Sequence, residues 1–155
     1  MSLFISYSTN FPISDSLEEK LNKALSYIFK EEGITDSSIN LKILTDEDIK
    51  ELNKKFRNKN TTTNVLSFSN EDVSKSITGN LGDIAISYEF VKRESKEHKK
   101  NFDDHMIHML VHGVYHILGF DHENDEMADI MEICLLYTSD AADEGLGVDL
   151  GGRRI

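Results

Sequence analysis

The sequence predicts an α+β fold: a four-stranded mixed β-sheet with helices packed on it. Two observations predict this fold class. Apolar residues recur either at every second position or at helical spacing, and the two patterns follow the order β-α-β-α-β-β-α-α-α along the chain. The changes of pattern coincide with capping residues and glycines rather than with a long linker. With 155 residues, 39% of them hydrophobic, the chain can bury one core. We therefore expect residues 1–133 to form a single domain.

The first third of the chain is predicted to form a strand, a helix and a second strand. Residues 3–7 alternate apolar and polar side chains, which is typical of a strand. Ser16 and Glu19 have the spacing of a capping box, and Gly33 ends the helix that follows. Residues 39–44 form the second predicted strand. The apolar positions of the helix are Leu17, Leu21, Ala24, Leu25 and Ile28.

The middle third is predicted to hold one helix and two strands. Thr45 is expected to cap the helix. The apolar face of this helix consists of Ile49, Leu52 and Phe56. A polar loop leads to a strand at residues 65–68, and a second polar segment leads to a strand at residues 81–86.

Three helices are predicted after the last strand. Ser87 begins the first, over residues 87–98, and Asp103 or Asp104 opens the second, which ends at Gly119. The third runs over about residues 125–133. This order completes the α+β pattern.

We interpret residues 134–155 as a non-native tail. The segment reads CLLYTSDAADEGLGVDLGGRRI, and both its ends look like translated sequencing-adapter DNA. The helical pattern before it stops where it begins. A natural tail rich in glycine and aspartate is the alternative. We exclude the segment from the predicted domain.

The charge and the absence of targeting signals restrict the class of protein. The net charge is −11, and residues 1–133 alone carry about −9 (15 bases − 24 acids), which excludes a general polyanion-binding protein. No apolar run has the ~18 residues of a membrane span, and no secretory signal is visible. Cys134 is the only cysteine, so no intramolecular disulfide is possible. We expect a cytoplasmic protein with no membrane association. Its oligomeric state is not readable from the sequence.

The basic residues nevertheless gather in two clusters. One consists of Lys54, Lys55, Arg57 and Lys59. The other consists of Lys92, Arg93, Lys96, Lys99 and Lys100. Two interpretations stay open at this point: a local positive surface, or solvated helix ends whose late cations complement the helix dipole.

Histidines form a stripe on the predicted helix that ends at Gly119. At about 100° per residue, four of them fall within roughly 80°, opposite the aliphatic face. They are His105, His108, His112 and His116. A turn at Gly119 can bring His122 back towards His112 and His116. Three neutral imidazoles on one ion leave a position open for water, as in catalytic zinc sites. We therefore predict one Zn²⁺, although nickel or copper would also fit chemically.

The residues beside the predicted three-histidine site indicate which reactions it can catalyse. Zinc proteases show the spacing H-E-x-x-H-x-x-G-x-x-H, in which the Glu is the general base. Gly113 stands at the position of that Glu, so the site is zincin-like in spacing but lacks the protease base. Asp121 is a candidate to orient a ligand imidazole. Whether His105 or His108 contacts the metal or substrate stays open.

Three segments resemble one known family. H-G-V-Y-H-I-L-G-F-D-H, residues 112–122, resembles the signature of the YbeY family of bacterial endoribonucleases. F-R-N-K-N-T-T-T-N-V-L-S-F, residues 56–68, resembles its arginine-containing loop and the following strand. G-D-I-A-I-S, residues 82–87, resembles its next strand. Tyr115 and Ser69 depart from residues usual in the family without touching the site.

The resemblance implies a function and a set of site residues. It implies a single-strand-specific endoribonuclease that acts in 16S rRNA 3′-end processing and ribosome quality control. It implies zinc held by His112, His116 and His122, with Arg57 as a functional arginine. Metal-activated water or hydroxide would then drive phosphodiester cleavage while Arg57 holds the phosphate. The implied partners are an rRNA precursor and the ribosome or its proteins.

Two other functions stay open on the sequence. One is a zinc metallohydrolase of peptides or small molecules, against which Gly113 argues. The other is a non-catalytic ribosome-assembly factor in which the metal serves folding. Thr63, Asn64 and Ser67 offer polar groups near the loop mouth under either the nuclease interpretation or an ordinary structural one.

Overall fold

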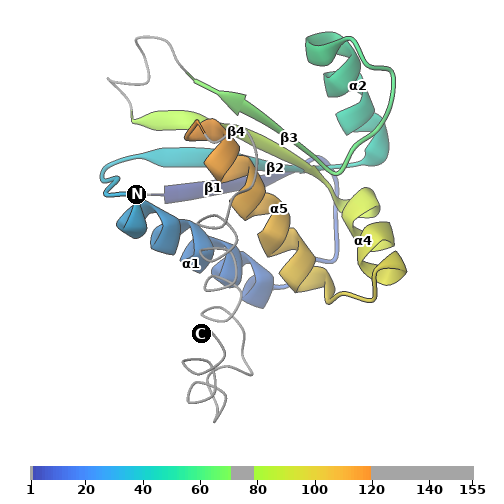
Figure 1. Ribbon diagram of the computed structural model, residues 1–155. Helices are drawn as coiled ribbons and strands as arrows, with labels where there is room; N and C mark the ends of the chain where they lie inside the picture. The colour runs from blue at the N-terminus through green and yellow to red at the C-terminus, as the bar shows by residue number, and fades with distance from the viewer. Residues whose placement is uncertain (1, 71–78, 120–155) are drawn as a thin grey trace.

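The β-sheet organises the molecule. The computed structural model describes residues 2–70 and 79–119, in which four strands form one mixed sheet in the order β1-β2-β4-β3 (Figure 1). The strands are β1 (Ser2–Tyr7), β2 (Ser38–Leu44), β3 (Val65–Ser69) and β4 (Asn80–Ser87). β1, β2 and β4 run parallel, whereas β3 pairs antiparallel with β4 and forms one edge. The predicted α+β fold with a four-stranded mixed sheet is confirmed.

Four helices pack against this sheet within the described residues. They are α1 (Asp15–Glu31), α2 (Asp46–Arg57), α4 (Tyr88–Glu97) and α5 (Phe102–Ile117). α1 and α5 lie on one face of the sheet, and α2, at the upper right of Figure 1, packs on a separate core. The predicted helix at residues 125–133 and the segment 134–155 lie outside the described residues. None of the helices in residues 2–70 and 79–119 combines the length and apolar composition of a membrane span.

The helix starts agree with the capping residues at two positions and differ at two. Thr45 and Ser87 cap α2 and α4 as predicted. The expected start at Ser16 is wrong, because the hydroxyl of Ser14 accepts the hydrogen bond from the Leu17 amide and α1 begins two residues earlier. α5 likewise begins at Phe102, capped by the preceding asparagine rather than by an aspartate. Acidic residues in each first turn favour these earlier starts through the helix dipole.

The main core lies between the sheet and the pair α1 and α5. Alternate residues of each strand point to this face, because successive side chains of a strand alternate. The fully buried side chains there include Leu21, Leu25, Ile39, Leu41, Ile43, Ile84, Ile86, Leu110 and Val114. α5 therefore rests on β4 with its aliphatic face inward, as its hydrophobic pattern predicts.

A smaller core lies on the opposite face, under α2. It consists of Ile49, Leu66 and Ala85. Burial decreases along the helix, since Leu52 is half-buried and Phe56 is 58% exposed. On β1, Phe4 points to this same face and is 57% exposed. α2 thus covers the part of this face that β4 and the end of β2 provide and leaves Phe4 on β1 exposed.

Candidate active site

His112 and His116 are presented by the last two turns of α5. His116 is exposed and His112 is half-buried, one turn earlier on the same helix. Between them, Gly113 is buried against β4: a Cβ on it would lie 3.0–3.1 Å from three side-chain atoms of Ile84. The absence of a side chain at Gly113 is therefore what allows the histidine-bearing helix to lie so close to the sheet.

Ser67 of β3 contacts the imidazole of His116. Its Oγ lies 3.1 Å from Nδ1 of His116. When Nδ1 carries the proton and donates it to this hydroxyl, Nε2 keeps its lone pair and is available as a metal ligand. His112 and His116 lie one turn apart, and Ser67 orients the ring of His116. Two such imidazoles are a donor set that fits zinc.

Arg57, at the end of α2, also contacts Ser67. Arg57 is the last residue of α2, and its Nη2 donates a hydrogen bond to the main-chain carbonyl of Ser67 at 3.0 Å. The guanidinium also lies over the ring of Phe68, 5.7 Å from its centroid. Asn58 ends α2 in the left-handed conformation with φ 58°, which turns the chain away and leaves Arg57 exposed. The fold therefore brings Arg57 and His116 together at Ser67.

A polar cavity lies beside Arg57 at the loop before β3. It has a volume of about 280 Å³, and its lining includes Lys59 and the hydroxyl-bearing residues 61–63. The buried side chain of Asn53 donates to the carbonyl of Thr61 at 2.9 Å and holds this loop. The cavity offers cations and hydroxyl groups, which suits an anionic ligand.

Asp46 fixes the loop before β3 through Thr62. Its carboxylate accepts hydrogen bonds from Ser87 at 2.6 Å, Arg93 at 2.8 Å and Thr62 at 3.3 Å. Burial opposes ionisation of Asp46, but these hydrogen bonds, above all that from Arg93, outweigh it and lower the pKa of Asp46 below its ordinary value. Arg93, predicted as part of a basic cluster, therefore has a structural role.

His105 does not share the Ser67 contacts of this site and instead pairs with Glu94. It is only 5% exposed, and its Nε2 lies 3.0 Å from Oε1 of Glu94 on α4. Glu94 also accepts a hydrogen bond from Asn64 at 3.1 Å. Burial opposes ionisation of Glu94, and the hydrogen bonds to His105 and Asn64 outweigh it, so the pKa of Glu94 lies below its ordinary value. His105 thus ties α5 to α4 and to the start of β3.

Of the other predicted site residues, the structure describes His108 and Gly119 but not Asp121 and His122. The His108 ring is half-buried and packs edge-on against that of His105, with centroids 5.8 Å apart. Gly119 has φ +108°, consistent with the turn predicted there. His122 and Asp121 lie outside the described residues, and among residues 2–70 and 79–119 no three metal-binding side chains cluster. The third ligand stays a prediction.

Sequence patterns do not single out two residues that support this site from outside it. Glu94 and Asp46 each join segments far apart in sequence, and no spacing pattern marks such residues. Ser67 was suggested only as one of several polar groups. Strand alternation supplies the signal for it, since Ser67 has the parity of the core-facing Val65 and is a polar residue in the middle of a short strand.

Comparison with known proteins assigns the family. A family model described as endoribonuclease YbeY matches residues 4–134. The chain belongs to the YbeY endoribonuclease family. The predicted resemblance is thereby confirmed, and the protein is a nuclease, a hydrolase, by family.

Individual relatives agree with this YbeY assignment. The chain is 37% identical over 119 residues to endoribonuclease YbeY of Francisella philomiragia, covering 74% of this chain and 75% of the relative. It is 35% identical over 122 residues to that of Francisella tularensis, covering 74% and 71%. The solution structure of TM1509 from Thermotoga maritima superposes with a TM-score of 0.63 at 27% identity, covering 88% of this chain and 89% of that one.

Proposed function

We propose that this protein is a zinc-dependent, single-strand-specific endoribonuclease that processes ribosomal RNA precursors. His112, His116 and His122 would hold the ion, and Arg57 would hold the phosphate of the scissile bond. The observation that carries the proposal is the meeting of Arg57 and His116 at Ser67, with hydrogen bonds of 3.0 and 3.1 Å. Arg57, a cation that can bind phosphate, and His116, an imidazole that can bind metal, both contact Ser67.

The residues have separable roles in this mechanism. A bound zinc ion supplies Lewis-acid chemistry and a water of lowered pKa. Ser67 orients the His116 ring. Arg57 presents a fixed pair of donors that matches a phosphate and stabilises the charge that develops on its oxygens. The half-buried His112, one turn below His116, completes the helix-borne half of the site.

Packing argues against the peptide-hydrolase alternative. The zinc-protease base would stand at residue 113, where a Cβ would point at Ile84 and lie only 3.0–3.1 Å from three of its side-chain atoms. A glutamate there would be driven into the core instead of towards the metal. Phosphodiester cleavage does not need this carboxylate, and family membership favours a nuclease over a non-catalytic assembly factor.

Ribosomal RNA and the ribosome are the partners that this function requires. The net charge of −11 gives free RNA little long-range attraction. Recruitment to an rRNA precursor by the ribosome or its proteins would supply that attraction. A cytoplasmic location is part of the same proposal.

The decisive experiment compares Arg57→Ala, His116→Ala and the control Lys54→Ala, which removes a nearby exposed cation of α2. We measure cleavage of single-stranded RNA, bound zinc and urea unfolding for each. Arg57→Ala is expected to lower cleavage about 100-fold or more with zinc content and folding unchanged, and His116→Ala to lose zinc and cleavage together. Full cleavage by Arg57→Ala, or hydrolysis of casein instead of RNA by the wild type, would overturn the proposal.

A further inference from the structure

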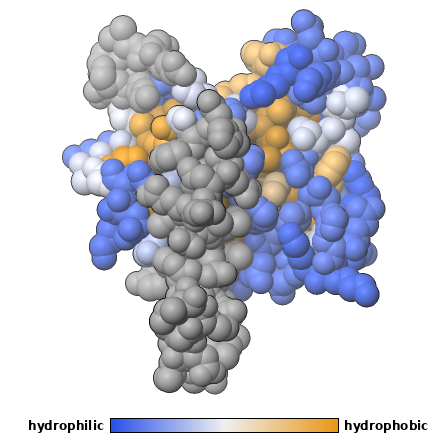
Figure 2. All heavy atoms as spheres, viewed as in Figure 1, coloured by the Kyte–Doolittle hydropathy of each residue, from blue (hydrophilic) through white to orange (hydrophobic). Residues whose placement is uncertain are grey.

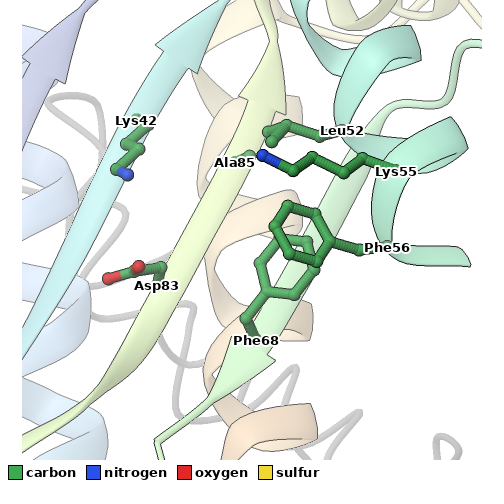
Figure 3. A pocket seen from close by; sticks show the side chains of 7 residues that line it. All are labelled: Lys42, Leu52, Lys55, Phe56, Phe68, Asp83 and Ala85. Atoms are coloured by element: carbon green, nitrogen blue, oxygen red, sulfur yellow. The ribbon is translucent and has the colours of Figure 1, made fainter.

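The second face of the sheet carries a groove with exposed aromatic rings. It has a volume of about 410 Å³ and lies between the C-terminal half of α2 and the strands β2, β4 and β3. We call it the aromatic groove, and the residues that define it are Lys42, Leu52, Lys55, Phe56, Phe68 and Asp83 (Figure 3). Its volume is in the range of small-ligand sites. Figure 2 shows hydrophobic surface beside the hydrophilic outer side of α2.

Two phenylalanine rings form its apolar wall. The rings of Phe56 and Phe68 meet with centroids 5.4 Å apart at an interplanar angle of 62°. Phe56 is 58% exposed and Phe68 is half-buried. Figure 3 shows these rings side by side, one from α2 and one from β3. An exposed aromatic ring at the wall of a groove is a surface on which a planar ligand can stack.

The charges around the rings select a ligand with both a planar part and anionic groups. Lys55 Nζ lies 5.4 Å from the Phe56 centroid, and Arg57 lies over Phe68. Both distances are near the outer limit of about 6 Å for a cation–π contact. Because the Lys55 side chain is exposed, a base can displace it from the Phe56 ring and its ammonium can then contact a phosphate, while Arg57 stays on the Ser67 carbonyl.

The floor of the groove favours a base over a phosphate. Asp83 places a carboxylate there, and Asn40 fixes it with a hydrogen bond of 2.9 Å. This negative charge repels a phosphate, but it can accept hydrogen bonds from the N–H groups of a base, either an amino group or the ring N–H of uracil. An apolar protein segment would instead have to bury Lys42, Lys55 and Asp83.

The aromatic groove is continuous with the candidate active site through Arg57. Ser67 faces the histidines and Phe68, the next residue, faces the groove, because neighbouring side chains of a strand point to opposite faces. β3 is the edge strand of the sheet, so a flexible polymer can cross it without passing another strand. Arg57 touches both residues at this edge.

We propose that the aromatic groove binds bases of single-stranded RNA next to the scissile phosphate, with Phe56 and Phe68 as the stacking surface. Lys42 and Lys55 would contact the flanking phosphates. This proposal rests on the proposed nuclease function, whose substrate it positions. It assigns a binding subsite on the sheet face opposite the histidines.

Binding of an oligonucleotide tests this subsite apart from cleavage. Fluorescence anisotropy with the zinc-loaded full chain measures affinity for a short 2′-O-methylated oligouridylate, checked for integrity on a gel, and for an abasic oligomer of the same length. The variants are Phe56→Ala, Phe56→Leu and Phe56→Tyr. The control is Phe4→Ala, an equally exposed phenylalanine that lies on the same face of the sheet but does not line the groove.

The expected result separates stacking from general contact. Phe56→Ala and Phe56→Leu are expected to weaken oligouridylate binding about five- to tenfold, the lower range for loss of one base–aromatic stack. Phe56→Tyr and Phe4→Ala should bind as the wild type does, and abasic binding should be unchanged in all four. Unchanged oligouridylate affinity in Phe56→Leu, or no binding by the wild type, would overturn the subsite, as would an equal loss in Phe4→Ala. Wild-type protein that binds in a base-dependent way but cleaves no RNA would overturn the nuclease function and leave the subsite standing.

Discussion

At the scale of single residues, Ser67 contacts both Arg57 and His116. Its carbonyl fixes Arg57 and its hydroxyl contacts His116, although these partners come from helices on different sides of the sheet. A serine hydroxyl can accept from a ring nitrogen without competing for a metal. Ser67 is therefore a positioning residue of the candidate site rather than a catalytic one.

Replacing Ser67 should weaken metal binding without unfolding the protein. Ser67→Ala removes the partner of His116 Nδ1 and keeps the carbonyl that holds Arg57. We expect zinc affinity to fall about tenfold, as for loss of other partners of metal-bound histidines. Competition with a chromophoric chelator measures it, and Ser6→Ala on β1 is the control. Equal zinc affinity in the two variants would mean that Ser67 does not orient the ring.

At the scale of elements, the site depends on how closely α5 approaches its neighbours. Gly113 sets the distance to β4, and the pair His105–Glu94 joins α5 to α4. Glu94 also holds Asn64, just before β3, so one carboxylate links the helix that carries the histidines to the strand that carries Ser67. Small changes at these contacts should move the site as a unit.

Adding one methyl group at Gly113 should strain the α5–β4 contact. Three Ile84 atoms lie 3.0–3.1 Å from the new Cβ, so Gly113→Ala is expected to destabilise the protein by about 1–3 kcal/mol, as overpacking does. Urea unfolding measures this loss. Adding Ile84→Val removes one of the contacting atoms and should recover part of it. If the double variant is less stable than the sum of the single ones predicts, the contact is not the cause.

The Glu94 contacts should make stability depend on pH in the acid range. The pKa of Glu94 is lowered in the folded protein, so its contribution is fully present above the ordinary glutamate pKa of 4.5 and is lost as the pH falls through the lower folded value. Glu94→Gln is expected to cost about 1 kcal/mol at neutral pH, and its difference from the wild type should shrink below pH 4.5. Urea unfolding over this pH range measures it, with exposed Glu97→Gln on the same helix as control. A pH-independent difference would exclude this role.

At the scale of the whole molecule, an acidic chain presents exposed cations beside the candidate site, at the C-terminal end of α2. Arg93 is paired with Asp46, whereas Arg57 and Lys55 stay exposed beside the candidate site and the aromatic groove. Local positive charge on a negative body favours short contacts with RNA over long-range attraction. Recruitment by a larger partner fits this arrangement.

The interpretation of residues 134–155 can be tested by removing them. A chain shortened after residue 133 is expected to keep the zinc content, RNA cleavage and unfolding midpoint of the full chain, because we place the whole domain before that point. The two proteins are compared side by side in these three assays. A loss of stability or activity on shortening would show that the segment belongs to the domain.

The sequence by itself determined the order of strands and helices from residue 2 to residue 117 and the common face of His112 and His116. These features follow from periodicities of two and 3.6 residues, which are local properties of the chain. It also carried the family signature in contiguous motifs. Local pattern did not fix the capping positions of α1 and α5, because several polar residues near one helix start compete for the same amides.

Only the tertiary structure decided which of these residues meet. Ser67 and His116 are 49 positions apart, and no local pattern relates them. The same packing buried His105 against Glu94, although its helical position put it in the stripe with His116, and left Phe56 exposed at the end of an apolar face. Burial and long-range contacts depend on where elements lie against each other, and that is fixed by the whole core rather than by any one segment.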